Sequence, residues 1–313
     1  MKNHKITILL GTYNGVKYLE EQLESLLDQT HENWSLYVHD DGSEDDTLSI
    51  LIDYNNRYPE KIKLLQSKNS YRSASQNFGY LLGQTDAEYI MFCDQDDVWY
   101  PQKIEMTLLK MLEMEEMHPE SSILIHTDLT VADENLNKID DSFWHYAHLD
   151  PDYDNFERLL MQNIITGCTV MINRALKERA LPIPKGAIMH DWWLGLVAAR
   201  FGKIGYISEV TMAYRQHNNN DTGAKRFGLY EVLQHFLRYF DSTILHQQIL
   251  RNRLQAESFL VRFSSQLKPK ELKMLEMFIE LESLSFVDRR KVLLKYGLLK
   301  QGWIRNAGLL ARI

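Results

Sequence analysis

The strongest constraint on the fold is an alternation of short apolar runs with segments of helical periodicity over the first hundred residues. Short apolar runs are typical of buried strands, and apolar residues that recur on one face are typical of helices. The predicted strands are Lys5–Gly11, Trp34–Asp40, Ile62–Gln66 and Tyr89–Cys93, and the predicted helices are Val16–Asp28, one starting at the N-cap residue Ser43, and Ala74–Gly83. Strands joined by crossover helices form a parallel sheet, so the pattern predicts an α/β fold that binds ligands at the carboxyl ends of its strands.

The rest of the chain predicts more strands and then only helices. The predicted elements are a helix from Pro101 to Met117, a strand at Ser122–Val131, a helix at Phe156–Asn163, an extended segment at Thr169–Asn173, a helix at Asp191–Arg200, and strands at Lys203–Ile207 and Val210–Tyr214. The aperiodic stretch Asp133–Asp154 predicts a loop over the site, with a disordered insertion as the alternative. The pattern is helical from Phe227 onward, so we expect a sheet domain at residues 1–222 and a helical appendage at 223–313.

Composition excludes several classes of protein. Of the 313 residues, 44% are hydrophobic and 25% are charged, as in ordinary globular proteins. A formal charge of −8 argues against a nucleic-acid binder, and two cysteines are too few for a disulfide framework. The apolar run Ile6–Leu10 is too short for a signal peptide, and no uncharged stretch approaches the roughly 18 residues of a membrane span. We therefore expect a cytoplasmic location.

Acidic residues follow two of the predicted strands, where a parallel sheet binds its ligands. The motif Asp40-Asp41-Gly42-Ser43 ends the second strand, and Asp94-Gln95-Asp96-Asp97 follows the fourth. Carboxylates packed this closely repel one another unless a cation lies between them. Oxygen ligands suit Mg²⁺ or Mn²⁺, and Mg²⁺ sites commonly include substrate phosphates. Asp94 and Asp96 therefore indicate a metal–diphosphate site, whereas Asp97 is equally suited to stabilise the N-terminus of the following helix.

The successive motifs resemble those of inverting family 2 glycosyltransferases, which have a GT-A fold. The motifs are Thr12-Tyr13-Asn14, Gln29-Thr30, Asp40-Asp41-Gly42-Ser43, Gln76-Asn77 and Asp94-Gln95-Asp96-Asp97-Val98-Trp99. Two later motifs are similar to the bacterial rhamnosyltransferase branch, which builds cell-wall, capsule and O-antigen polysaccharides: His190-Asp191-Trp192-Trp193 and Tyr214-Arg215-Gln216-His217-Asn218. The resemblance runs from about Lys5 to Asn220, and the motifs stand in the family's order.

The resemblance implies a donor site that holds a nucleoside diphosphate sugar and a metal. Thr12, Tyr13 and Asp41 would bind the nucleotide, Asp94 the ribose, and Asp96 the Mn²⁺ or Mg²⁺ that bridges the diphosphate. The expected donor contacts also include Asn14, Asn77, Gln95 and Arg215. His217 would reach the metal or the diphosphate, although a lone histidine is more often structural.

Inverting transfer also needs a base that removes the acceptor's hydroxyl proton. The family uses an Asp at the start of a helix beyond the acceptor pocket, and Asp191 matches that position. His190 stands where the family usually has an acid, a variant typical of the rhamnosyl branch. The alternative is that Asp191 only stabilises the helix N-terminus. Trp99, His190 and Trp192 are candidates for a wall against the sugar, although aromatic residues near a core usually belong to it.

The function expected from this resemblance is inverting transfer of L-rhamnose from dTDP-β-L-rhamnose to a growing glycan. The same chemistry with a UDP-hexose and a non-catalytic glycan-assembly subunit are the alternatives. A sugar nucleotidyltransferase would need a basic residue in the loop Gly11-Thr12-Tyr13-Asn14-Gly15, which has none.

The last 25 residues differ in charge from the rest of the chain. From Arg289 to Ile313 there are seven Lys or Arg and no Asp or Glu, interleaved with leucines and Trp303. This pattern is typical of an amphipathic helix at the surface of an anionic membrane. An ordinary docked helix and a subunit contact are the alternatives. A lipid-linked acceptor would favour the first, at the inner face of the plasma membrane.

Overall fold

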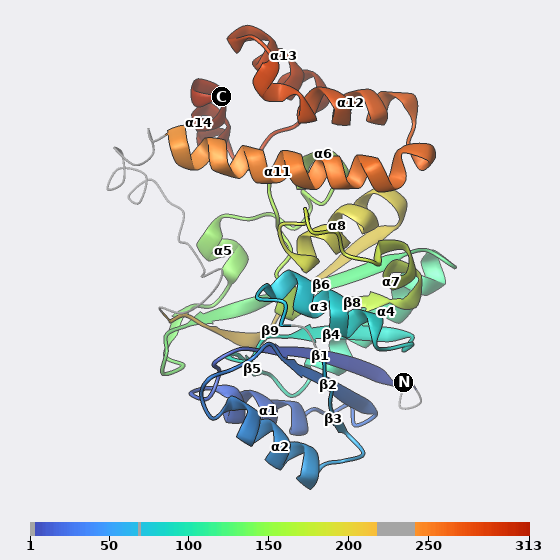
Figure 1. Ribbon diagram of the computed structural model, residues 1–313, viewed down its shortest axis with the longest axis vertical. Helices are drawn as coiled ribbons and strands as arrows, with labels where there is room; N and C mark the ends of the chain where they lie inside the picture. The colour runs from blue at the N-terminus through green and yellow to red at the C-terminus, as the bar shows by residue number, and fades with distance from the viewer. Residues whose placement is uncertain (1–3, 68–69, 218–241) are drawn as a thin grey trace.

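The computed structural model describes residues 4–67, 70–217 and 242–313. They form a mixed nine-stranded sheet with helices on both faces (Figure 1). The strand order is β3-β2-β1-β4-β8-β6-β9-β5, and β7 pairs with β6. This is the α/β architecture that the sequence predicts, with antiparallel strands added beyond β4.

The first half of the sheet is parallel. Its strands are β1 (Ile6–Thr12), β2 (Trp34–Asp40), β3 (Ile62–Leu64) and β4 (Tyr89–Cys93), connected by helices α1 (Leu19–Leu27), α2 (Thr47–Arg57) and α3 (Ala74–Gly83). Helix α2 begins four residues later than the sequence predicts, because Ser43 is not its N-cap. Instead, the backbone N–H and the hydroxyl of Ser43 both bind the Asp40 carboxylate.

The second half is mixed. Its strands are β5 (Val98–Trp99), β6 (Ile123–Ala132), β7 (Lys138–Asp140), β8 (Met171–Asn173) and β9 (Lys203–Arg215). Strand β8 runs antiparallel to both β4 and β6, so β6 runs in the direction of β4. The two strands predicted over residues 203–214 are one strand, β9, whose pairing with β6 shifts register near Asp128.

The two faces of the sheet bury separate apolar clusters. Alternate residues of β1 point to opposite sides, with Ile8 in one cluster and Leu9 in the other. Helices α1, α2 and α4 (Lys103–Met117) cover the Ile8 side, while α3 and α8 (His190–Phe201) cover the Leu9 side (Figure 1). Shorter helices complete the domain: α5 (Phe143–Ala147), α6 (Phe156–Leu159) and α7 (Arg174–Ala180).

The stretch Asp133–Asp154 is more ordered than the sequence predicts. It contains β7 and α5, and the buried Asp128 of β6 fixes the start of α5. The Asp128 carboxylate accepts hydrogen bonds from the Ser142 hydroxyl and from the backbone N–H groups of Phe143 and Trp144. This stretch is therefore ordered by hydrogen bonds to one buried acid, which hydrophobic periodicity in the sequence cannot reveal.

After the sheet region, residues 242–313 form four helices that share its core: α11 (Ser242–Phe263), α12 (Pro269–Ile279), α13 (Phe286–Tyr296) and α14 (Trp303–Arg312). Helix α11 lies across α6 and α8 (Figure 1), and Phe259 packs on Phe156 and Trp193. The predicted division between residues 222 and 223 lies outside the described residues. Within the described parts of the chain, no helix combines the length and apolar composition that a membrane crossing requires.

Candidate active site

The carboxyl ends of β1 and β2 bring the first predicted donor contacts together. The Thr12 hydroxyl donates to Asp40 Oδ2 at 3.2 Å, and the Asp41 N–H donates to the Thr12 carbonyl at 2.8 Å. Asp41 is 7% exposed, and its Oδ1 accepts the backbone N–H of Tyr71. The Asp41 carboxylate is therefore held in one orientation at this edge.

The loop after β1 is tied to both acidic motifs. Gln95 Oε1 accepts the Tyr13 N–H and Gln95 Nε2 donates to the Tyr13 carbonyl, each at 2.9 Å. Asn14, at a φ of 49°, accepts the Glu44 N–H through its side chain at 2.8 Å. A Cβ at Gly15 would lie 2.3 Å from Gln95 Oε1, so a side chain there would have to displace Gln95. These contacts leave the Tyr13 side chain 55% exposed at the rim of the site.

Asn77 lies behind this edge rather than in it. Its Oδ1 is 2.7 Å from His39 Nδ1 and its Nδ2 donates to the His39 carbonyl at 3.3 Å, while Asn77 itself is 4% exposed. Both polar atoms of the amide are thus occupied by β2. In this structure Asn77 joins α3 to β2 and does not face an open site.

Strand β9 ends beside the second acidic motif. His217 Nε2 lies 2.8 Å from Asp96 Oδ2, and the His217 ring stacks on Tyr18 with centroids 4.9 Å apart. Arg215 is 2% exposed and its guanidinium lies 4.4 Å from the Tyr18 ring centre. The guanidinium donates to the carbonyls of Asp96 and Glu134 and to the Glu21 carboxylate, and the Arg215 N–H donates to Asp97 Oδ1. Arg215 therefore joins helix α1, the loop of the second acidic motif and the loop at Glu134.

The remaining acids of the motif meet the segment that precedes β8. Ligand atoms of Asp94, Asp97 and Cys168 all lie within 4.8 Å of one another. Burial, followed by the charges of Asp96 and Asp94, raises the pKa of Asp97 well above its usual range. Burial also raises the pKa of Asp96, against which the hydrogen bond and charge of His217 act. The carboxylates of Asp94, Asp96 and Asp97 are hard oxygen donors of the kind that fits Mg²⁺ or Mn²⁺, whereas the Cys168 thiol beside them is not.

Asp191 contacts Gly167, the residue before Cys168, and so lies close to the same acidic motif. A Cβ on Gly167 would lie 3.6 Å from the Asp191 side chain, and the Gly167 backbone hydrogen-bonds the Asp191 carboxylate. Asp191 Oδ1 accepts the Trp192 N–H at 2.6 Å, and Oδ2 accepts Asn163 Nδ2 at 3.3 Å. Asp191 is 6% exposed, and burial raises its pKa to about 6. A carboxylate with this pKa is suited to accept a proton near neutral pH.

The three residues predicted to form a sugar wall are core residues in this structure. Trp99 is 2% exposed and Trp192 is 8% exposed, with its indole N–H donated to the Leu159 carbonyl. His190 is 3% exposed between Phe78 and Phe92, and neither ring nitrogen has a hydrogen-bond partner among the described residues. Burial lowers the pKa of His190 to about 3, so its ring is neutral. None of the three presents an open face to a sugar.

Sequence reasoning missed Tyr18 and Asn163. Tyr18 lies within the predicted helix Val16–Asp28, where apolar spacing predicts only packing, whereas its ring contacts both Arg215 and His217. Asn163 Oδ1 accepts the Ile165 N–H, and its Nδ2 donates to the Ile165 carbonyl and to Asp191. An Asn immediately before an apolar pair is a turn signal, but nothing in the sequence connects it to Asp191.

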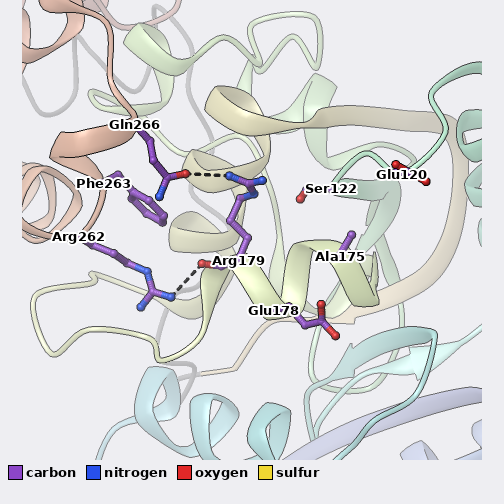
Figure 2. Close-up of a pocket in the computed structure, with 8 residues that line it drawn as sticks. All are labelled: Glu120, Ser122, Ala175, Glu178, Arg179, Arg262, Phe263 and Gln266. Carbon is purple, nitrogen blue, oxygen red and sulfur yellow. Dashed lines mark hydrogen bonds between the residues drawn. The ribbon is translucent and has the colours of Figure 1, made fainter.

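Figure 2 shows the residues that line a pocket of about 610 Å³, away from the candidate active site. Its lining includes Glu120 and Ser122, which precede β6, and Arg179 and Arg262. Because β6 runs in the direction of β4, its start lies away from the acidic motifs. Both arginines are engaged: Arg179 donates to Gln266, and Arg262 donates to backbone carbonyls that include that of Arg179. This pocket is separate from the candidate active site.

The basic tail is folded against the protein. Arg305 donates to the carbonyls of Ala147 and His148, and Lys300 donates to Gln248. Leu293, Leu298 and Leu309 of the same segment are buried. On its outer side Trp303 is 77% exposed and Leu294 is 57% exposed. The tail therefore has a docked inner face, as the alternative reading predicts, and an outer face that carries apolar side chains.

Comparisons with known proteins agree with this geometry. Residues 7–179 match the family described as glycosyl transferase family 2. The dTDP-rhamnosyl transferase RfbG of Shigella flexneri is 31% identical over 242 residues, which cover 70% of this chain and 78% of the relative. The putative teichuronic acid biosynthesis glycosyltransferase TuaG of Bacillus subtilis is 29% identical over 224 residues, which cover 70% of this chain and 82% of the relative.

Two solved structures have the same fold at low sequence identity. S. aureus TarS in complex with UDP matches with a TM-score of 0.54 and 19% identity, over 91% of this chain and 73% of that chain. The mannosyltransferase PcManGT of Pyrobaculum calidifontis, in complex with GDP-Man and Mn²⁺, matches with a TM-score of 0.53 and 13% identity, over 99% and 87%. The expected GT-A fold is thereby confirmed. With the family match over more than half of its length, this chain belongs to glycosyltransferase family 2.

Proposed function

We propose that this glycosyltransferase transfers L-rhamnose from dTDP-β-L-rhamnose to a glycan acceptor, with inversion at the anomeric carbon. The observation that carries the mechanism is that one segment, Gly167–Cys168, contacts both Asp191 and the acidic motif after β4. A candidate base and a candidate diphosphate site therefore lie at the same edge of the sheet. Support for the donor comes from the 31% identity to a relative named as a dTDP-rhamnosyl transferase.

In this proposal the loops after β1 and β2 bind the nucleotide. The exposed Tyr13 ring lies against the base, and the carboxylate of Asp41 accepts the N3–H of a thymine. Thr12 and Asn14 hold these loops together through Asp40 and Glu44. Gln95 keeps the Tyr13 backbone in place, and Asn77 acts from behind through His39.

Asp96 and His217 would hold a divalent cation, and Asp94 would contact the ribose. A bound Mn²⁺ or Mg²⁺ would supply positive charge to the departing nucleoside diphosphate. Arg215 acts here on the protein itself: its guanidinium binds the Asp96 carbonyl and fixes the loop that presents the acid. Its contribution to the diphosphate is therefore positional.

Asp191 would act as the general base. Its carboxylate takes the proton of the acceptor hydroxyl as that oxygen attacks the anomeric carbon from the side opposite the leaving group. The hydrogen bonds from Trp192, Asn163 and Gly167 orient the carboxylate. Because the group is almost fully buried, water competes weakly for the proton.

We propose that the acceptor is lipid-linked and that the enzyme works at the cytoplasmic face of the membrane, with residues 1–222 as the catalytic domain and 223–313 as the helical part. The exposed side chains of Trp303 and Leu294, among seven cations and no acids, support a membrane-facing tail.

A thermal-shift panel tests the donor assignment. The ligands are dTDP-rhamnose, UDP-glucose, UDP-galactose, UDP-N-acetylglucosamine, dTDP and UDP, each with and without Mn²⁺. A ligand at 100 times its Kd stabilises the native state by about 2.7 kcal/mol, which is a shift of several degrees. We expect the largest, metal-dependent shift with dTDP-rhamnose. A larger shift with a UDP-sugar would replace the donor, and no shift with any nucleotide would favour a non-catalytic assembly subunit.

A further inference from the structure

Helix α11 carries two buried amide side chains that contact segments close in sequence to Asn163 and Asp191. Asn252 and Gln255 are each 1% exposed and lie three residues apart, on the same side of the helix. Asn252 Nδ2 donates to the carbonyls of Leu160 and Met161 at 3.0 and 3.1 Å. Gln255 Oε1 accepts the N–H of Ile188 at 2.9 Å. One helix face therefore binds the backbone of two separate segments.

These two segments lead directly to Asp191 and its hydrogen-bond partner. Met161 lies two residues before Asn163, whose amide donates to Asp191 Oδ2. Ile188 lies three residues before Asp191, immediately ahead of the N-cap residue Met189 of α8. The position of Asp191 relative to Asn163 thus depends on two segments that Asn252 and Gln255 attach to the same helix.

Packing alone does not explain why residues 252 and 255 are amides, because each leaves one buried polar atom without a partner in the described part of the chain. Asn252 Oδ1 and Gln255 Nε2 have no hydrogen-bond partner among the described residues. A buried polar atom without a partner destabilises the folded state, because it has lost its hydrogen bonds to water. The neighbouring Phe259 already binds the same region through Phe156 and Trp193, and it does so without polar atoms. The hydrogen bonds to the two segments are what an apolar residue could not supply.

We infer that α11 positions the general base, with Asn252 and Gln255 as the positioning residues that set where Asn163 and Asp191 meet. The inference rests on the proposed role of Asp191. A displacement of about 1 Å at a reacting group lowers the rate by about 100-fold. The helical appendage is then required for the proton transfer at Asp191, in addition to any contact with the acceptor.

The test compares near-isosteric variants on one helix. Asn252→Leu and Gln255→Met each remove one attachment. Gln248→Met removes the contact of Gln248 Oε1 with Lys300 Nζ at 2.7 Å, which binds α11 to the tail and to neither of the two segments directly. We expect Asn252→Leu and Gln255→Met to lower kcat at least tenfold with the donor KM within twofold. Hydrogen exchange should become faster in residues 160–167 for the first and 188–192 for the second. Gln248→Met should leave kcat within twofold.

Several results would overturn the inference. The first is an unchanged kcat in folded Asn252→Leu and Gln255→Met. The second is a loss of kcat in Gln248→Met that equals theirs at an equal drop in Tm, which would make the role of all three residues purely structural. Each segment has its own variant, so failure of one to fold leaves the other as the test. Asp191→Asn separates the two claims: if it keeps full activity, the base assignment fails, whereas an inactive Asp191→Asn beside active α11 variants refutes the positioning role alone.

Discussion

Asp96 and Asp191 are both buried acids of the candidate site, yet their surroundings differ. Asp96 lies 2.8 Å from His217, and the guanidinium of Arg215 binds its backbone carbonyl. Asp191 has neutral donors as hydrogen-bond partners: the Trp192 N–H, the Asn163 amide and the Gly167 backbone. Burial raises both pKa values, but only around Asp96 do the charges of a histidine and an arginine act against it. Around Asp96 the neighbouring charges oppose the protonation that burial favours, whereas around Asp191 only neutral hydrogen-bond donors oppose it.

The largest effect that we expect is that of Asp191→Asn. Removing the base should lower the transfer rate by about 10²–10⁴-fold while the donor affinity stays within twofold. Single-turnover kinetics and calorimetry of donor binding measure the two quantities. Substantial transfer by this variant would mean that Asp191 is not the general base.

The same variant has a stability readout that needs no substrate. Because the folded pKa of Asp191 is raised to about 6, ionising this group costs stability as the pH rises through 6, and the cost is absent below about pH 4. Asp191→Asn should therefore raise the free energy of unfolding by about 1–3 kcal/mol at pH 8 and not at pH 4. Equal stability of both proteins at pH 8 would show that the carboxylate is not penalised by burial.

Asp96→Ala should act on the donor side alone. We expect donor affinity in Mn²⁺ to fall by about 10–100-fold, with a much smaller change when the metal is chelated. Glu134→Gln is the matched control, because among the residues that the structure describes its carboxylate makes only an exposed ion pair with Lys17. A metal-independent loss in Asp96→Ala, or the same loss in the control, would contradict the assignment.

Gly15→Ala tests the contact between the two donor loops. Its Cβ would displace Gln95 from the Tyr13 backbone and so remove two hydrogen bonds. We expect the donor Kd to rise by about fivefold to tenfold, with no change in the rate at saturating donor. Gly83→Ala is the control, since nothing lies within 4 Å of a Cβ there. Indistinguishable donor affinities would remove Gln95 from the donor side.

His190→Phe should have the smallest effect. The neutral ring of His190 lies in an apolar pocket with unpartnered nitrogens, so phenylalanine should raise the free energy of unfolding by up to about 1 kcal/mol. We expect kcat to stay within about threefold. A loss comparable to that of Asp191→Asn would mean that the ring nitrogens contact the substrate, as the sugar-wall prediction holds.

Most of the donor-binding residues could be predicted, because they stand in short motifs directly after predicted strands. Tyr89–Cys93 and Ala74–Gly83 have the bounds that the sequence predicts, and a parallel sheet brings the residues after such strands to one edge. The acids after β2 and β4 could therefore be expected near one another. The sequence does not specify which of these side chains face the site. Asn77, for example, binds His39 and does not face an open site.

The base pocket was predictable only at Asp191 itself. Its partner Asn163 and the α11 residues Asn252 and Gln255 come from distant parts of the chain, and single polar residues have no periodicity or spacing that marks them. The burial of Trp99 and Trp192 was equally hidden, because a sugar-binding tryptophan and a core tryptophan look alike in sequence.

The pH dependence of single-turnover transfer, measured beside that of donor affinity, tests the contrast between the two acids most directly. Asp191 must be ionised to accept a proton, so the rate at saturating donor should fall on acidification with a midpoint near pH 6. Donor affinity in Mn²⁺ should change little around that midpoint. A rate that is flat through pH 6, or a donor affinity that falls in parallel with it, would contradict the account.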